Sequence, residues 1–194
     1  MSRAATVTRA TTETSITVEL DLDGSGVASA ATGMPFFDHM LQQLGKHAGF
    51  DLAVTCVGDL QVDGHHTVED CGIAIGQALQ EALGDKAGVR RFASVVVPLD
   101  EAAVEVALDL AGRNFVIHEV PVPSEQINGF DTSLLEDFIR AFAQSAELTI
   151  HTHLRYGRSP HHICEATFKA LANALGDACA LTGRSGVPST KGVL

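Results

Sequence analysis

The chain contains no tryptophan, one tyrosine and only 5% aromatic residues in 194 positions. It therefore offers little from which to build a stacking surface for nucleic-acid bases. It also lacks any basic run, and its formal net charge is −11. This balance argues against nucleic acid or an anionic membrane as partner. A small anionic substrate remains possible, because a local group of Arg and Lys can override the overall sign.

Long apolar runs are also missing. No segment reaches the roughly 18 consecutive apolar residues of a membrane span, and residues 1–15 have no apolar stretch of the kind found in secretory signals. The four cysteines show no Cys-x-x-Cys spacing, so we interpret them as reduced, partly buried thiols. Together these absences predict a cytoplasmic protein. The cysteines are Cys56, Cys71, Cys164 and Cys179.

What the chain does have is enough apolar sequence for a core, and one motif that occurs twice. Apolar residues make up 45% of the chain and charged residues 19%, which argues against disorder. The stretch 63–70 holds a His-His-x-x-Glu pattern, and the same pattern returns at 161–165, with His161 placed 96 positions after His65. The two copies contain four of the nine histidines.

The surrounding elements repeat as well. In the first half, residues 15–22 and 27–32 are expected to form a hairpin, followed by a helix over 36–45, a strand over 51–57 and a helix ending at Gly84. In the second half, 103–110 and 115–120 flank another expected hairpin. Residues 133–139 match 35–41 at a shift of 98, and 147–150 match 51–54 at a shift of 96.

This order predicts an internal duplication of an α/β (α+β) unit. We divide the chain into a first repeat, residues 1–92, and a second repeat, residues 93–194, which together form one compact catalytic unit.

The doubled motif has the spacing of a metal site. Residues four apart lie on one face of a helix, so His65 and Glu69 can face one ion while His66 projects roughly 100° away. Imidazole and carboxylate donors without thiolate suit manganese, iron or zinc. The repeat adds His39 in the first half and Asp137 as its positional twin. Two candidate sites follow, one of His39, His66, His161 and Glu165, the other of His65, Glu69, Asp137 and His162.

A single His-His pair is more often an ordinary surface or core feature than a pair of ligands. Two copies with matched carboxylates favour metal binding instead. The other histidines lack this support: His151 and His153 share a strand face, but match Thr55 and Val57 in the repeat, which indicates a structural role. Phosphate-binding candidates are weaker individually, and solvated loop charge is the common alternative for each; they are Arg90, Arg91, Arg113 and the tail segment 189–192.

Four segments closely resemble the imidazoleglycerol-phosphate dehydratase family. They are Phe-Asp-His-Met-Leu at 37–41, Asp-Gly-His-His-Thr-Val-Glu-Asp at 63–70, the ten residues from 161 to 170, and Pro-Ser-Thr-Lys-Gly at 188–192. The likeness runs from about residue 9 to the end of the chain. It implies a fold in which each half is a four-stranded sheet packed on helices, similar to domain 2 of ribosomal protein S5.

The resemblance also implies an activity and a site. Members dehydrate D-erythro-imidazole glycerol phosphate to imidazole acetol phosphate in histidine biosynthesis, using two Mn²⁺ ions per active site. They assemble through trimers into a homo-oligomer of twenty-four subunits, with sites completed between neighbours. On matched positions, the expected catalytic residues are Glu13, His39, Glu69 and Glu165, and the expected substrate-binding residues are Glu13, Arg91, Arg113, Ser189, Thr190 and Lys191.

One position departs from the family pattern. Many members carry His where this chain has Asp137, between Glu136 and Phe138. A carboxylate is an acceptable hard ligand for manganese, so Asp137 stays in the predicted metal site.

The mechanism expected from these residues is an elimination. Metal on both ring nitrogens of the substrate would stabilise an imidazolate, Glu13 would take the carbon-bound proton, and the basic residues would hold the phosphate. Two alternatives remain at this point: a binuclear metallohydrolase, whose site would be richer in Asp, and a non-catalytic metal-binding assembly protein.

Overall fold

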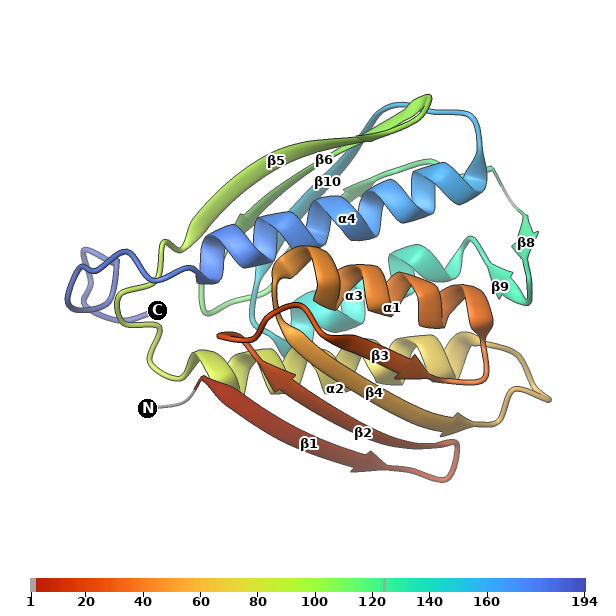
Figure 1. The fold of residues 1–194 in the computed structure, drawn as a ribbon, viewed down its shortest axis with the longest axis horizontal. Helices are drawn as coiled ribbons and strands as arrows, with labels where there is room; N and C mark the ends of the chain where they lie inside the picture. The colour runs from red at the N-terminus through yellow and green to blue at the C-terminus, as the bar shows by residue number, and fades with distance from the viewer. Residues whose placement is uncertain (1–2, 124) are drawn as a thin grey trace.

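Two four-stranded sheets enclose four helices in the computed structural model, which describes residues 3–123 and 125–194 (Figure 1). In the first half the elements are β1 (Ala4–Ala10), β2 (Thr14–Asp21), β3 (Ala28–Ala31), α1 (Pro35–Ala48), β4 (Asp51–Gly58) and α2 (His65–Leu83). In the second half they are β5 (Phe92–Leu99), β6 (Ala102–Asp109), β7 (Phe115–Glu119), β8 (Gln126–Ile127), β9 (Phe130–Asp131), α3 (Leu134–Ser145), β10 (Thr149–Tyr156) and α4 (Pro160–Cys179).

The two halves share one topology. The strand orders are β1-β2-β4-β3 and β5-β6-β10-β7, and in each sheet the last pair is parallel while the others are antiparallel. The small β8–β9 pair is inserted in the second half before α3. This arrangement confirms the predicted fold class and its duplication. The division proposed between residues 92 and 93 falls at the first residue of β5.

Both predicted hairpins are wrong, and in the same way. β2 pairs with β1, and β4 is inserted between β2 and β3. The turn-like residues 23–26 instead form a wider connection, in which the Asp51 carboxylate accepts N–H groups from Ser25 (2.8 Å) and Val27 (2.9 Å). β4 takes the inner place because it buries Leu52 and its alternate neighbours, whereas β3 buries none of its four residues. In the second half, β10 separates β6 from β7 for the same reason.

The predicted strand register of the repeat is also corrected. β10 begins at Thr149, which is 98 positions after the start of β4 at Asp51, not 96. The preceding turns agree, because Gly49 (φ 76°) and Glu147 (φ 54°) are the matching left-handed residues. A slip of two preserves the alternation of a strand, so the sequence pattern could not detect it. His151 and His153 consequently match Ala53 and Thr55.

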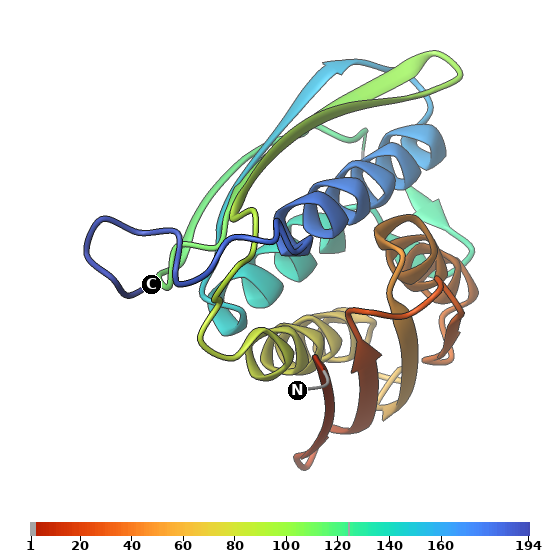
Figure 2. The ribbon, with the colours of Figure 1, turned by 60° about the vertical axis from the view of Figure 1, so that its left-hand side comes forward.

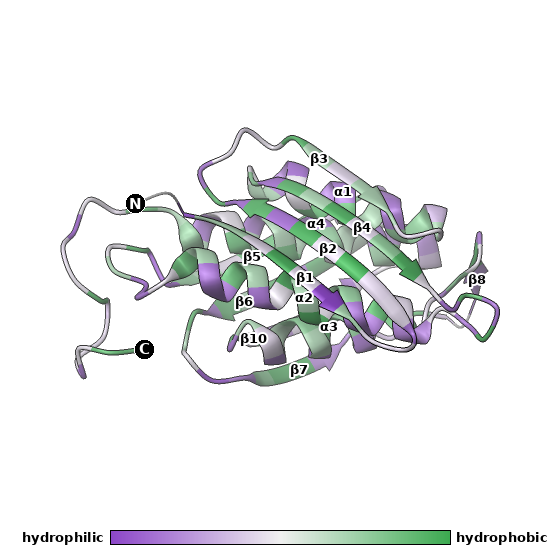
Figure 3. Cartoon of the chain, turned by 90° about the horizontal axis from the view of Figure 1, so that it is seen from below, coloured by the Kyte–Doolittle hydropathy of each residue, from purple (hydrophilic) through white to green (hydrophobic). Residues whose placement is uncertain are grey.

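The core lies between the sheets and is shared by both halves. α1 packs on α4, and α2 packs on α3, so each helix pair joins one half to the other (Figure 2). Hydrophilic and hydrophobic residues alternate along the first sheet (Figure 3), because its inner face packs on the helices. Within the described residues, no helix is both long and apolar enough to cross a membrane. The largest fully buried side chains include Phe37, Phe130, Phe138, Phe142 and Phe168.

Close helix packing predicts that Gly76→Ala will destabilise the chain. A Cβ at Gly76 would lie 2.6 Å from the Phe142 carbonyl oxygen and 2.8 Å from the Ser145 Cβ, on the facing helix α3. Forcing an extra carbon into a packed contact costs about 1–3 kcal/mol, or roughly 2–12 °C in Tm at about 2–4 °C per kcal/mol. Thermal unfolding measures it, with Gln77→Ala on the exposed face of α2 as control. An unchanged Tm for Gly76→Ala would contradict this packing.

Candidate metal and substrate site

The predicted ligands gather where the four helices begin. All four helices start at the same end of the molecule, near the β8–β9 pair (Figure 1). Proline at the first turn favours helix initiation at Pro35 in α1 and Pro160 in α4. The Ser159 hydroxyl accepts the N–H of His162 at 3.4 Å and caps α4. These starts fix the histidines on the first turns of their helices.

The first cluster joins α1 to α4. Glu165 Oε2 lies 3.2 Å from His161 Nε2 and 3.7 Å from His39 Nε2. One carboxylate oxygen therefore faces two ring nitrogens, one from α1 and one from α4. Phe36 packs against the His161 ring at 5.1 Å between centroids and limits its movement.

Lys169 holds the other oxygen of this carboxylate. Its Nζ lies 2.7 Å from Glu165 Oε1, one turn further along α4. Burial raises the pKa of Glu165, but the hydrogen bond and the charge from Lys169 outweigh it and leave the pKa below its usual value. Glu165 is thus ionised, with Oε2 directed at His39 and His161.

The second cluster joins α2 to α3. His65 Nε2 lies 3.9 Å from Glu69 Oε2, and His65 Nδ1 lies 3.2 Å from Asp137 Oδ2. The two carboxylates therefore face opposite nitrogens of one ring. A carboxylate on the nitrogen that a metal leaves free is the usual way to fix a ligand histidine. A hollow of about 560 Å³ opens beside this cluster, lined by His65, Asp137 and residues of the β8–β9 pair.

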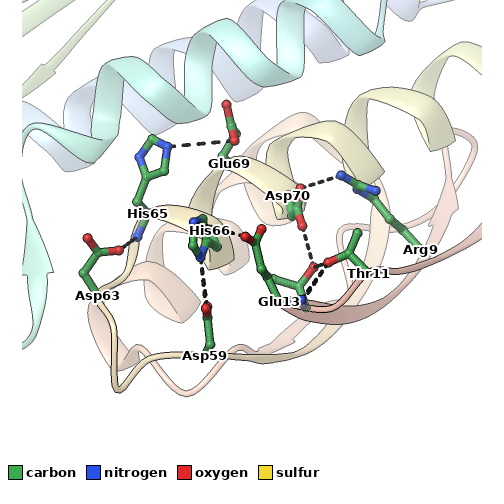
Figure 4. A network of polar contacts seen from close by, with 10 residues as sticks. Arg9, Thr11, Glu13, Asp59, Asp63, His65, His66, Glu69 and Asp70 are labelled. Carbon is green, nitrogen blue, oxygen red and sulfur yellow. Dashed lines mark hydrogen bonds and ion pairs between the residues drawn. The ribbon is translucent and has the colours of Figure 1, made fainter.

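His66 projects away from the His65–Glu69 pair, toward Glu13 in the β1–β2 turn (Figure 4). Its Nδ1 lies 3.1 Å from both carboxylate oxygens of Asp59, and its Nε2 lies 3.7 Å from Glu13 Oε1. The hydrogen bond to Asp59 raises the pKa of His66, and the charge on Glu13 adds to the shift. Glu13 thus lies beside a predicted ligand, as the resemblance implies.

His162 repeats this arrangement in the second half. Its Nδ1 lies 2.6 Å from Glu101 Oε2, and its Nε2 lies 3.8 Å from Asp100 Oδ2. The hydrogen bond with His162, and another from the Ser159 N–H, lower the pKa of Glu101 to about 2. The bond to Glu101 in turn raises the pKa of His162.

Sequence reasoning missed three carboxylates, Asp59, Asp100 and Glu101. Asp100 and Glu101 form the β5–β6 turn, the counterpart of the β1–β2 turn that carries Glu13. Had the true strand pairs been recognised, that equivalence would have been visible in the sequence. Asp59 has no such signal, because the loop after β4 follows tertiary packing.

Each predicted set of four ligands is therefore represented by three neighbours in one chain. His66 and His162 are directed elsewhere, and within 3–123 and 125–194 no three His, Cys, Asp or Glu side chains are arranged closely enough to hold an ion alone. The donor chemistry nevertheless fits manganese, since it combines imidazole nitrogen and carboxylate oxygen. All four cysteines are buried as free thiols.

The predicted phosphate-binding residues come together at a second place. Arg91, Arg113, Ser189, Thr190 and Lys191 line a hollow of about 560 Å³ formed with the C-terminal tail. Arg91 is fixed there by Asp109, at 2.7 Å and 3.2 Å, and donates to the Pro188 carbonyl at 2.8 Å. Arg90 does not join them and lies 3.7 Å from Asp177 instead.

This tail hollow is far from the two clusters. The Arg91 N–H donates to the carbonyl of Ala178 at the end of α4, 17 residues after His161, or about 25 Å along the helix. The tail and the helix starts occupy opposite ends of the molecule (Figure 1). One chain therefore cannot present both groups to a small molecule.

Comparison with known proteins decides the family. The family model described as "Imidazoleglycerol-phosphate dehydratase" matches residues 32–175. The chain belongs to the imidazoleglycerol-phosphate dehydratase family. Relatives of that name from Frankia casuarinae and Pelotomaculum thermopropionicum are 54% and 50% identical, covering 100% and 99% of this chain and 100% and 98% of their own length.

Solved structures of family members agree. The Pyrococcus furiosus enzyme in complex with (S)-C348 superposes with a TM-score of 0.84 at 37% identity, covering 97% of this chain and 100% of its own. The Staphylococcus aureus enzyme superposes with a TM-score of 0.83 at 34% identity, covering 92% and 99%. The predicted family, and with it the class of a water-eliminating lyase, is confirmed.

Proposed function

We propose that this chain removes water from imidazole glycerol phosphate to give imidazole acetol phosphate, the histidine-biosynthetic step for which its family is named. The observation that carries the proposal is the pair of matched clusters at the helix starts, each with three of the predicted ligands. Family membership favours this activity over a metallohydrolase or a non-catalytic metal-binding protein.

Two manganese ions per active site fit the donors present. The first would be held by His39, His161 and Glu165, the second by His65 and Glu69 with Asp137 beside them. His66 and His162 would complete the sites across subunits. Bound there, the ions would supply Lewis acidity to the imidazole ring of the substrate.

The remaining chemistry belongs to side chains of this protein. Glu13 would accept the proton from the second carbon of the glycerol chain, while the hydroxyl on the carbon next to the ring leaves as water. The resulting enol then rearranges to the ketone. Because Glu13 is half-exposed on a short turn, it can face a substrate bound at His66.

A homo-oligomer is required by this proposal. The tail hollow and the clusters lie about 25 Å apart along α4, so phosphate and ring must be bound by different copies. Assembly through trimers into twenty-four subunits, as the resemblance implies, would satisfy this. We further propose the cytoplasm as the compartment, which the four free, buried cysteines support.

Assay of ketone formation from imidazole glycerol phosphate, with and without added manganese, tests the function. Metal content after dialysis gives a second measurement that does not depend on turnover. We expect manganese-dependent product and two bound ions per chain. Bound metal without turnover would favour the metal-binding protein, and ester or amide hydrolysis would favour the metallohydrolase.

Loss of a phosphate contact is expected to change KM more than kcat. Arg113→Met removes an exposed cation from the tail hollow without disturbing a pair. A hydrogen bond to a charged group contributes about 1.5–3 kcal/mol, so KM should rise roughly 10- to 150-fold. The value of kcat should be nearly unchanged, because the phosphate does not react and the contact is made equally in the ground state and the transition state. Steady-state kinetics measure this, with Arg140→Met on α3 as control. Equal KM values would remove Arg113 from the site.

A further inference from the structure

A buried polar network joins the β1–β2 hairpin to α2 (Figure 4). Asp70, which follows Glu69 on α2, accepts from Arg9 Nη2 at 2.7 Å and from the Thr14 hydroxyl at 2.5 Å. The Asp70 side chain is 7% exposed and that of Arg9 29%. Both carboxylate oxygens of Asp70 are thereby directed at the hairpin rather than at the metal clusters.

The network continues to the backbone of Glu13. The Thr14 hydroxyl lies 3.4 Å from the Thr11 hydroxyl, whose oxygen accepts the N–H groups of Glu13 at 3.1 Å and Thr14 at 3.0 Å. In addition, the Glu13 carbonyl accepts the N–H of Asp59 at 3.1 Å. The turn that carries Glu13 is therefore fixed to α2 from one side and to the loop after β4 from the other.

In the second half, the positions that correspond to this network are occupied by apolar residues. Strand register places Val97 and Ala102 where the first half has Arg9 and Thr14, since Arg9 pairs with Ile16 and Val97 with Val104. On the helices, Ala166 occupies the position of Asp70, 96 residues later. Val97 is partly buried and both alanines are fully buried. The duplicated fold thus needs no ion pair at this position.

An ion pair of this kind contributes little net stability. The free-energy cost of desolvating two charges can equal or exceed the gain from their attraction. Replacing a whole buried network with apolar residues therefore often leaves the stability of the protein unchanged or raises it. Here Arg9 Nε is also buried without a hydrogen-bond partner, which adds a cost. Stability therefore does not explain why one half carries the network and the other half does not.

We propose that Asp70, acting through Arg9 and Thr14, is a positioning residue that holds Glu13 at its distance from His66. The inference rests on the proposed role of Glu13 and adds three side chains that act without touching substrate. Only the first half carries the network. Of the two matching turns, only the β1–β2 turn carries the proposed base, Glu13. A misplacement of about 1 Å at a reacting group can cost about 100-fold in rate.

The test transfers the apolar set of the second half into the first. The variant R9V/T14A/D70A replaces all three polar groups together, so no buried charge is left alone. We expect Tm to be unchanged or higher, manganese content to be unchanged, KM to change little and kcat to fall about 10- to 100-fold. Thr8→Ala, on the exposed face of β1, is the control. Wild-type kcat in the triple variant would overturn the proposal.

A second comparison separates positioning from a general structural effect. In a Glu13→Gln background, the same three substitutions should have almost no further effect on kcat, because the group they position is already lost. A full-sized additional loss in that background would show that the network acts elsewhere and would overturn the proposal.

Amide hydrogen exchange distinguishes failure of this inference from failure of the base assignment. Exchange at Glu13 and Thr14 should be faster in the triple variant, whatever Glu13 does chemically. If Glu13→Gln alone keeps full turnover while exchange behaves as expected, the role of Glu13 fails and the holding contact stands. Unchanged exchange in the triple variant would overturn the holding contact itself.

Discussion

Glu165→Gln is expected to empty the first metal cluster and to remove nearly all turnover. Glu165 Oε2 is the only carboxylate oxygen that faces both His39 and His161 among the described contacts. Glutamine keeps the shape but removes the negative charge, and it leaves Lys169 with a weaker partner. Substitution of a residue that merely orients a ligand lowers metal affinity about 10- to 100-fold. Substitution of a ligand itself should therefore lower metal affinity at least about 100-fold.

Metal analysis after dialysis measures this effect independently of activity. We expect one manganese per chain to be lost and the ion at His65 and Glu69 to be retained, with kcat reduced at least about 100-fold, the lower end for loss of a charge-stabilising group. Glu136→Gln is the matched control, since Glu136 is an exposed carboxylate that pairs with Arg140 on α3. Two tightly bound ions per chain in Glu165→Gln would contradict the assignment of Glu165 as a ligand.

The parts of this site that the sequence predicts are those that depend on helix geometry. A spacing of four on α4 brings His161 to Glu165, and the same spacing on α2 brings His65 to Glu69. The repeat then located His39 and Asp137 on other helices, and both lie in the clusters where the predicted ligand sets put them. Local periodicity and duplication were sufficient for these four contacts.

The parts that could not be predicted depend on strand pairing. β1 has weak alternation, and only Val7 among its seven residues is buried, so its pairing with β2 has little hydrophobic signal. The apolar strand β4 then displaces β3 from the hairpin that the turn residues favour. Without the correct hairpins, the matching turns that carry Glu13 and Glu101 could not be aligned. The partners of His162, Asp100 and Glu101, were missed for that reason.

For Asp137, the sequence repeat and the contacts in the structure point to different roles. By repeat it is the twin of the ligand His39, yet it contacts His65 through Nδ1 while Glu69 faces Nε2. In this geometry its carboxylate fixes the orientation of the ring, and a direct bond to metal stays a prediction. Metal content of Asp137→Asn at the second cluster separates these roles, since loss of orientation weakens binding and loss of a ligand removes it.

Glu13→Gln is expected to abolish proton removal while leaving the metal sites loaded. The carboxylate is half-exposed, lies 3.7 Å from His66 Nε2 and is held on a short turn whose backbone is fixed on both sides. Glutamine keeps the size and the hydrogen-bonding reach of the side chain but cannot accept the proton. General-base catalysis contributes about 10²- to 10⁴-fold, so kcat at saturating manganese should fall by that range.

The remaining properties of Glu13→Gln should resemble the wild type. Manganese content should be unchanged and KM should change little, because Glu13 is not among the predicted metal ligands and glutamine keeps the size of the side chain. Glu19→Gln, an exposed carboxylate further along β2, is the matched control. Near wild-type turnover in metal-loaded Glu13→Gln would exclude Glu13 as the base. It would direct the search to Asp100, which faces Nε2 of His162 as Glu13 faces Nε2 of His66.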